Sequence, residues 1–179
     1  MSRAAVGQLL YLLDEAFEGV EQVWHSVLAN LRSVTEDDWL WVPPDGARTI
    51  RQITSHIGGS VYLYYDRAFG NRAVFGDPIS NWNIPAGNLG VGTLDLDSDR
   101  RLENEPPKAH VIAWVTERAR AFRDAVSRLD DAALMEERTN HHGQPHAIRW
   151  FVAVMIQHYS YHAGEINHIR ALHQRDDSG

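Results

Sequence analysis

Proline constrains the fold of this chain more than any other residue, because its seven copies leave four long segments free of it. Proline lacks a backbone N–H and clashes with the preceding helical turn, so a long helix can form only between prolines. In each of the four segments, apolar residues recur at spacings of three and four, which is typical of amphipathic helices. The prolines are Pro43, Pro44, Pro78, Pro85, Pro106, Pro107 and Pro145.

The first segment predicts a single helix of about seven turns from Val6 to Leu31. The second opens with Thr49-Ile-Arg-Gln52, a capping-box pattern in which each side chain binds the backbone N–H of the other residue. The third segment follows Pro107, and the fourth follows Pro145. The predicted buried faces are Val6, Leu10, Leu13, Phe17, Val20, Trp24, Val27 and Leu31; Ile50, Ile53, Ile57, Val61 and Tyr64; Val111, Val115, Ala119, Phe122, Val126 and Leu129; and Phe151, Met155, Tyr159, His162, Ile166, Ile169 and Leu172.

Four long amphipathic helices without convincing alternating strands predict an all-α four-helix bundle, with residues 1–179 forming one domain. The stretch from about 72 to 107 is rich in Gly, Asn, Asp and Pro and too long for a tight turn. It predicts a long crossover, or a functional lid, between the second and third long helices. The alternative is an α+β domain with a hairpin within 73–96.

Composition limits the chemistry available to the chain. The absence of Cys excludes disulfides, thiolate zinc sites, iron–sulfur clusters and cysteine nucleophiles, whereas ten His are present. A transition metal would therefore have imidazole and carboxylate ligands. The net charge of -7 argues against nucleic acid or an anionic membrane as partner. The apolar patch Leu9–Leu13 is too short for a signal peptide or a membrane span, so we expect a cytoplasmic protein.

Two histidines on the predicted fourth helix form a candidate metal site. His158 and His162 are four residues apart, so they lie on one helical face about 6 Å apart. Core residues Met155 and Ile166 flank them, which places both rings at or beside the interior. The spacing alone is a weak signal, because each ring could instead donate to a carbonyl or a Tyr hydroxyl. Two ligands also fall short of the three protein ligands usual for catalytic zinc.

A third ligand should come from another helix. His56 ranks first because it lies between two predicted core isoleucines, but His25 and His110, at the edges of their apolar faces, stay open. Glu165 shares the face of the histidine pair. It could be a fourth ligand, an acceptor that orients an imidazole, or a catalytic general base. An ion pair on the helix surface is its structural alternative.

Other marked residues have simpler explanations. His141, His142 and His146 crowd the loop before the fourth helix, where they could line a site, although solvated loop histidines are the favoured interpretation. Gly164 beside the histidine pair, and Gly58-Gly59 after His56, are predicted to permit close helix packing.

Two segments resemble the DinB/YfiT-like superfamily of metalloenzymes. Trp41-Val-Pro-Pro followed by Thr49-Ile-Arg-Gln-Ile-Thr-Ser-His56-Ile57 is similar to the family's Trp–Pro loop and helix-two histidine. His158-x-x-x-His162-x-Gly164-Glu165 is similar to the signature on its last long helix. The resemblance spans nearly the whole chain and implies a metal triad of His56, His158 and His162 at one end of the bundle. Tyr161 departs from it, since many members have another His there.

The resemblance further implies the bundle with its crossover, frequent homodimers, and S-transfers or isomerisations that use mycothiol- or bacillithiol-type thiols. Because the chain has no Cys, a small thiol would have to supply the sulfur nucleophile. We therefore expect a metal-dependent S-transferase acting on a small-molecule substrate, with zinc the first choice of divalent metal and nickel the second. The alternatives are a metal-dependent hydrolase, with Glu165 as a possible general base, and a non-catalytic metal- or ligand-binding bundle.

Overall fold

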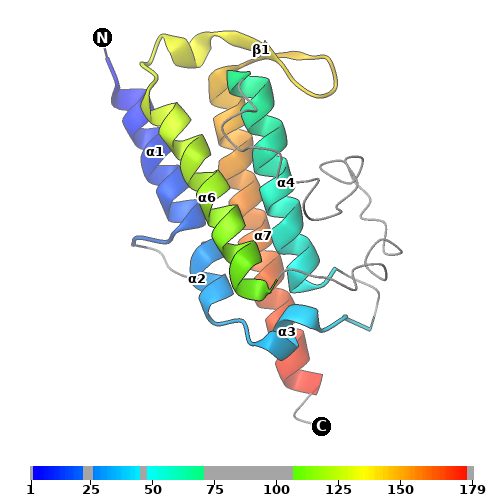
Figure 1. Ribbon diagram of the computed structural model, residues 1–179. Helices are drawn as coiled ribbons and strands as arrows, with labels where there is room; N and C mark the ends of the chain where they lie inside the picture. The colour runs from blue at the N-terminus through cyan, green and yellow to red at the C-terminus, as the bar shows by residue number, and fades with distance from the viewer. Residues whose placement is uncertain (1, 22–25, 45–47, 71–106, 177–179) are drawn as a thin grey trace.

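The computed structural model describes residues 2–21, 26–44, 48–70 and 107–176 and confirms a predominantly helical bundle (Figure 1). Its long helices are α1 (Ala4–Phe17), α4 (Ile50–Phe69), α6 (Lys108–Ser127) and α7 (Ile148–Asp176). The shorter elements are α2 (Val27–Arg32), α3 (Glu36–Leu40), the 3-10 turn η5 (Ala133–Met135), β1 (Glu137–Thr139) and β2 (Pro145–Ala147).

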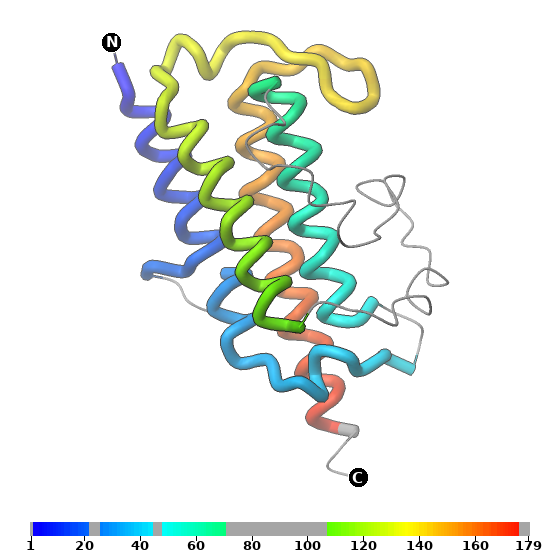
Figure 2. Tube along the Cα trace, in the orientation of Figure 1, coloured from blue at the N-terminus to red at the C-terminus, as the bar shows by residue number. Residues whose placement is uncertain are grey.

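The four long helices pack in a ring in which α4 contacts α6 and α7, and α1 contacts the same two helices. In the view of Figure 2, α1 and α7 run downward while α4 and α6 run upward. Phe69, at the end of α4, and Lys108, at the start of α6, therefore lie at opposite ends of the bundle. Residues 71–106, which carry the predicted crossover or lid and the alternative hairpin within 73–96, lie outside the described residues.

The prediction of one seven-turn first helix is wrong. Helix α1 ends at Phe17, and Gly19 takes a left-handed φ of 74°, a conformation that interrupts a right-handed helix. A new helix, α2, starts after Ser26, whose hydroxyl accepts the Ala29 N–H. Val20, predicted to be buried, is 70% exposed at this break. The spacing of apolar residues continues through the break, but the helix does not.

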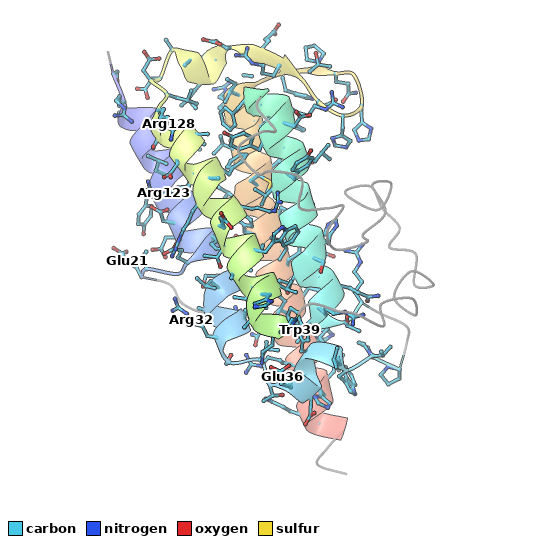
Figure 3. The ribbon with its side chains drawn as sticks, in the orientation of Figure 1. Glu21, Arg32, Glu36, Trp39, Arg123 and Arg128 are labelled. Carbon is cyan, nitrogen blue, oxygen red and sulfur yellow. The ribbon has the colours of Figure 1, made fainter. Side chains whose placement is uncertain are left out.

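The apolar faces predicted for the other long helices do form the core, with the last position of each only partly buried. Figure 3 shows Arg123 on the side of α6 that faces α1, where its guanidinium binds both carboxylate oxygens of Asp14 at 2.8 and 3.0 Å. This ion pair joins the two helices at the rim of the core. No helix in the described part of the chain is long and apolar enough to cross a membrane.

Several short elements outside the long helices were not expected from the sequence, among them α3 and a hairpin of two strands. Helix α3 lies in the predicted connection before α4 and carries Trp39, which is labelled in Figure 3. The Trp39 side chain is 3% exposed. The strands β1 and β2 pair antiparallel directly before α7, with Arg138 opposite His146. The hairpin is tied to α7 by the Ile148 N–H, which donates to the Glu136 carbonyl. It therefore covers the end of the bundle at which α7 begins (Figure 1).

Candidate metal centre

Three histidine side chains from two helices converge inside the bundle. The Nε2 atom of His158 lies 3.1 Å from that of His56 and 3.1 Å from that of His162. Around a tetrahedral zinc with Zn–N distances of 2.0–2.1 Å, neighbouring nitrogens are about 3.3 Å apart. Within the described residues, these three form the one group of His, Cys, Asp or Glu that could hold a metal ion.

The contacts at His158 Nε2 are difficult to explain by hydrogen bonding alone. A neutral imidazole nitrogen carries either one hydrogen or one lone pair, so it forms one normal hydrogen bond. His158 Nε2, however, has two Nε2 neighbours at 3.1 Å. A divalent ion would accept all three lone pairs at once. The nitrogen-only donor set and its spacing therefore fit a borderline metal such as zinc or nickel.

The start of α4 fixes the position of His56. The predicted capping box is present: the Thr49 N–H donates to Gln52 Oε1 at 2.8 Å, and the Gln52 N–H donates to Thr49 Oγ1 at 3.1 Å. One turn further, Ile53 and Ile57 are fully buried on either side of His56. Packing of both isoleucines leaves His56 facing the adjacent α7, as the sequence predicted.

Helix α7 supplies the other two rings from successive turns. Its core face includes Met155, Tyr159 and Ile166, all at most 1% exposed. His162 lies on this face and is 3% exposed, while His158 is partly buried one turn earlier. Because α4 and α7 pack against each other, the expected i,i+4 pair meets His56 across their interface.

Glu165 acts on the site through His162. Its Oε2 lies 2.6 Å from His162 Nδ1, so a hydrogen on Nδ1 donates to the carboxylate and leaves the Nε2 lone pair facing the other two rings. Burial raises the pKa of Glu165, but the hydrogen bond from His162, aided by Arg48, outweighs burial and holds that pKa below its usual range. The carboxylate is therefore ionised when it orients the ring.

The environment keeps the other two rings neutral. Burial lowers the pKa of His56 to about 4, with smaller contributions from the neighbouring His162 and Arg48 side chains. Burial also lowers the pKa of His158 to about 3, with further contributions from His162 and His56. Neutral imidazoles keep the lone pairs that metal ligation requires.

The remaining histidines lie elsewhere. His25 is outside the described residues, and His110 and His168 are exposed on their helices. His173 donates from Nδ1 to Asp38 Oδ1 at 2.8 Å and stacks with Trp41, which ties α7 to α3. None of these described histidines joins the converging group.

Two of the three histidines before α7 pack within the hairpin, whereas the third is exposed as predicted for a solvated loop. His146 stacks on Trp150 at a centroid distance of 4.0 Å, and His141 packs edge-on against Tyr64. Both rings are partly buried, whereas His142 is exposed. The structure therefore gives His141 and His146 aromatic partners, which the sequence spacing did not indicate.

Two glycine predictions have different outcomes. A Cβ on Gly58 would lie 2.0 Å from the Trp114 ring of α6, so this glycine does permit close packing, two residues after His56. Gly164 was wrongly assigned the same role: it is exposed, and among the described residues no atom outside its own helix backbone lies within 4 Å of its Cβ position. The sequence pattern also did not identify Arg48, whose charge lowers the pKa values of His56, His158 and Glu165. A single Arg before a helix belongs to no periodic pattern.

Comparison with known proteins supplies the family. No curated protein matches the chain. The family model described as the DinB superfamily, however, matches residues 20–166, a range that contains all three converging histidines. The chain therefore belongs to the DinB superfamily.

Proposed function

We propose that this protein is a metal-dependent S-transferase that uses a divalent ion bound by His56, His158 and His162 to activate a low-molecular-weight thiol. The observation that carries the proposal is the pair of 3.1 Å contacts at His158 Nε2, which suit a common ion better than hydrogen bonds. Membership of the DinB superfamily supports the same interpretation. Zinc is the first choice of metal and nickel the second.

The chain's own residues define the chemistry in this proposal. A divalent ion held by neutral ligands keeps its full charge and favours the deprotonated form of a thiol. Glu165 holds a proton on His162 Nδ1 and so directs the Nε2 lone pair inward. The chain has no Cys, so the sulfur nucleophile comes from a small thiol of the mycothiol or bacillithiol type. The acceptor is an electrophilic small molecule.

In this proposal Glu165 is a positioning residue rather than a general base. Its Oε2 is engaged by His162 at 2.6 Å, so proton abstraction by that oxygen would break the contact that orients the ring. This arrangement favours thiol transfer over the hydrolase alternative, in which the carboxylate would accept a proton from water. We also propose that the protein forms a homodimer and acts in the cytoplasm.

Two measurements test it in sequence. Elemental analysis of protein without an affinity tag should find about one zinc or nickel per chain, because three protein ligands are usual for such an ion. Turnover of an electrophile such as 1-chloro-2,4-dinitrobenzene should then require an added thiol and should be lost in the His158→Ala variant. The exposed His168→Ala variant is the matched control.

The outcomes separate the alternatives. Turnover of an activated ester without thiol would replace the S-transferase with a hydrolase. A stoichiometric metal with no turnover in either assay would favour a non-catalytic metal-binding bundle. Protein without metal, with the His158→Ala variant unchanged, would exclude the metal centre.

A further inference from the structure

We infer that Tyr161 lies at the entrance to the three-histidine centre and packs against an aromatic ring of the electrophile that accepts the thiol. This inference rests on the proposed function and adds the chemical class of the acceptor. Tyr161 belongs to the α7 signature, where it departs from the pattern of many family members, and the metal ligands and Glu165 leave it without a role.

Tyr161 lies directly against a histidine of the centre. Its ring contacts the ring of His162 edge-on, with the two centroids 5.0 Å apart and the planes inclined at 80°. On α7 it also follows His158 by three residues and precedes Glu165 by four, spacings that bring side chains together on one helical face. The ring contact and the helix geometry therefore agree in placing Tyr161 beside the centre.

The centre is closed by the core on one side and accessible on the side that Tyr161 borders. His162 is 3% exposed, and Ile166, one turn further on the core face, is fully buried. His158 is only partly buried, and the Glu165 side chain is 26% exposed. A molecule from solvent therefore approaches past His158 and Glu165, the two helical neighbours of Tyr161.

The outer side of the Tyr161 ring is available to such a molecule. The residue is 69% exposed, and it forms no hydrogen bond within the part of the chain that the structure describes. Tyr11, the exposed tyrosine of α1, instead donates its hydroxyl to Glu21 at 3.0 Å. Gly164, one turn after Tyr161, adds no side chain, and no described atom outside its own helix backbone lies within 4 Å of its Cβ position. The surface beside the ring is therefore open.

An exposed ring in a fixed orientation suits a flat aromatic partner. Edge-on contact with His162 orients Tyr161 before anything binds, so less conformational freedom is lost when a second ring packs on it. Aromatic pairs also attract each other beyond the burial of their area. The thiol binds at the centre through its sulfur, whereas the acceptor approaches that sulfur from solvent and so passes Tyr161. Aromatic acceptors are therefore favoured over aliphatic ones.

The test compares an aromatic and an aliphatic acceptor of the same acyclic thiol. Zinc-loaded protein without a tag is assayed with 2-mercaptoethanol and either 1-chloro-2,4-dinitrobenzene or iodoacetamide, after subtraction of the rate without protein. In both reactions the thiolate sulfur bonds to the carbon that carries the halogen, the halide leaves with the bonding electrons, and the thiol proton passes to solvent. The thiol contributes no ring, so a difference between the two assays reports on the acceptor.

The Tyr161→Ala variant should affect only the aromatic acceptor. Its KM for 1-chloro-2,4-dinitrobenzene should rise roughly five- to tenfold, the effect of one aromatic pair, while its KM for iodoacetamide stays within about twofold of wild type. The kcat values should change by less than about twofold, because Tyr161 contacts no reacting atom.

Two further variants make the result specific. Tyr161→Phe keeps the ring and removes the hydroxyl, so both KM values should match wild type. Tyr11→Ala removes the exposed tyrosine of α1 and should alter neither KM. Equal loss with both acceptors in Tyr161→Ala would indicate a structural role or a contact with the thiol. That result, or loss with neither acceptor, would overturn the inference.

Failure of the proposed function gives a different pattern. If neither acceptor is turned over, thiol transfer is wrong, and binding of the unreactive aromatic 4-nitrobenzyl alcohol then decides the role of Tyr161. NMR titration measures its dissociation constant with the zinc-loaded protein. Binding that weakens about fivefold in Tyr161→Ala, but not in Tyr161→Phe, retains Tyr161 as an aromatic binding residue. Binding that is absent, or indifferent to Tyr161→Ala, rejects it.

Discussion

The two histidine clusters of this chain use the same residue type in opposite ways. In the core cluster, His56, His158 and His162 point their Nε2 atoms at one another. In the hairpin cluster, His141 and His146 lie against the rings of Tyr64 and Trp150 instead. Rigid helices hold the first set, and a short hairpin carries the second. The direction of the nitrogens, rather than the number of histidines, therefore separates a candidate metal centre from aromatic packing.

The largest expected difference is in metal affinity. His158→Ala removes the ring whose Nε2 contacts both other nitrogens, and two remaining ligands hold an ion poorly. We expect zinc affinity to fall by on the order of a hundredfold or more, beyond the loss typical of a supporting residue. Competition with a chromophoric chelator measures the dissociation constant of zinc for each variant.

His146→Ala is the matched control in the hairpin cluster. It removes a partly buried imidazole that stacks on Trp150, so zinc affinity should not change. Similar losses of zinc in the two variants would erase the distinction between the clusters.

A second, smaller difference concerns the carboxylate that supports the core cluster. Glu165→Ala removes the acceptor for His162 Nδ1, and zinc affinity should fall by roughly 10- to 100-fold, as for other residues that orient a metal ligand. Glu165→Gln keeps an acceptor and should recover part of the loss. Glu137→Ala, on an exposed strand residue of the hairpin, should have no effect. A loss equal to that of His158→Ala would indicate that Glu165 is itself a ligand.

Much of the core cluster could be predicted because its signals are local, although the spacing ranked His56 first without excluding His25 and His110. The i,i+4 pair on α7 and the flanking isoleucines of His56 are visible in the spacing, and packing of two apolar faces brings them together. The hairpin cluster gives no comparable signal. Its strands have three residues each, Glu137–Thr139 and Pro145–Ala147, too short for a recognisable alternation.

Other features were missed because they depend on distant or irregular contacts. The helix break after Phe17 keeps the spacing of apolar residues, so only the conformation of Gly19 reveals it. The pair of Asp38 and His173 joins residues 135 positions apart, which no local pattern can indicate. The Gly58–Trp114 contact confirms a glycine prediction, yet the partner ring could not be named from the sequence.

The third expected effect tests whether helix packing holds the core cluster. Gly58→Ala places a methyl group 2.0 Å from the Trp114 ring, so α4 and α6 must separate or the indole must move. Overpacking of this kind costs about 1–3 kcal/mol in the free energy of unfolding. We expect that loss in urea denaturation, together with weaker zinc binding, because His56 is only two residues away.

Gly164→Ala supplies the comparison on α7. No neighbouring atom of the described residues lies within 4 Å of its Cβ position, so alanine should stabilise the helix by about 0.5–1 kcal/mol. Zinc affinity should not change in this variant. If Gly58→Ala also leaves both quantities unchanged, the Trp114 contact does not fix the position of α4.

The smallest expected effect is in the titration of the hairpin. Burial lowers the pKa of His141, and the charges of His142 and Arg67 lower it further. The unfolded chain takes up a proton near pH 6.5, so protonation disfavours the packed ring and its stabilising contribution falls as the pH drops below that value. Arg67→Gln should raise the pKa of His141 only slightly, since Arg67 is exposed and its charge is screened by solvent. NMR titration of the His141 imidazole measures this shift.

Zinc should have no effect on the same titration. Because the His141 ring packs on Tyr64 and lies outside the converging nitrogens, one equivalent of zinc should leave its titration unchanged. A zinc-dependent shift would make the hairpin a second ligand cluster and remove the contrast between the two.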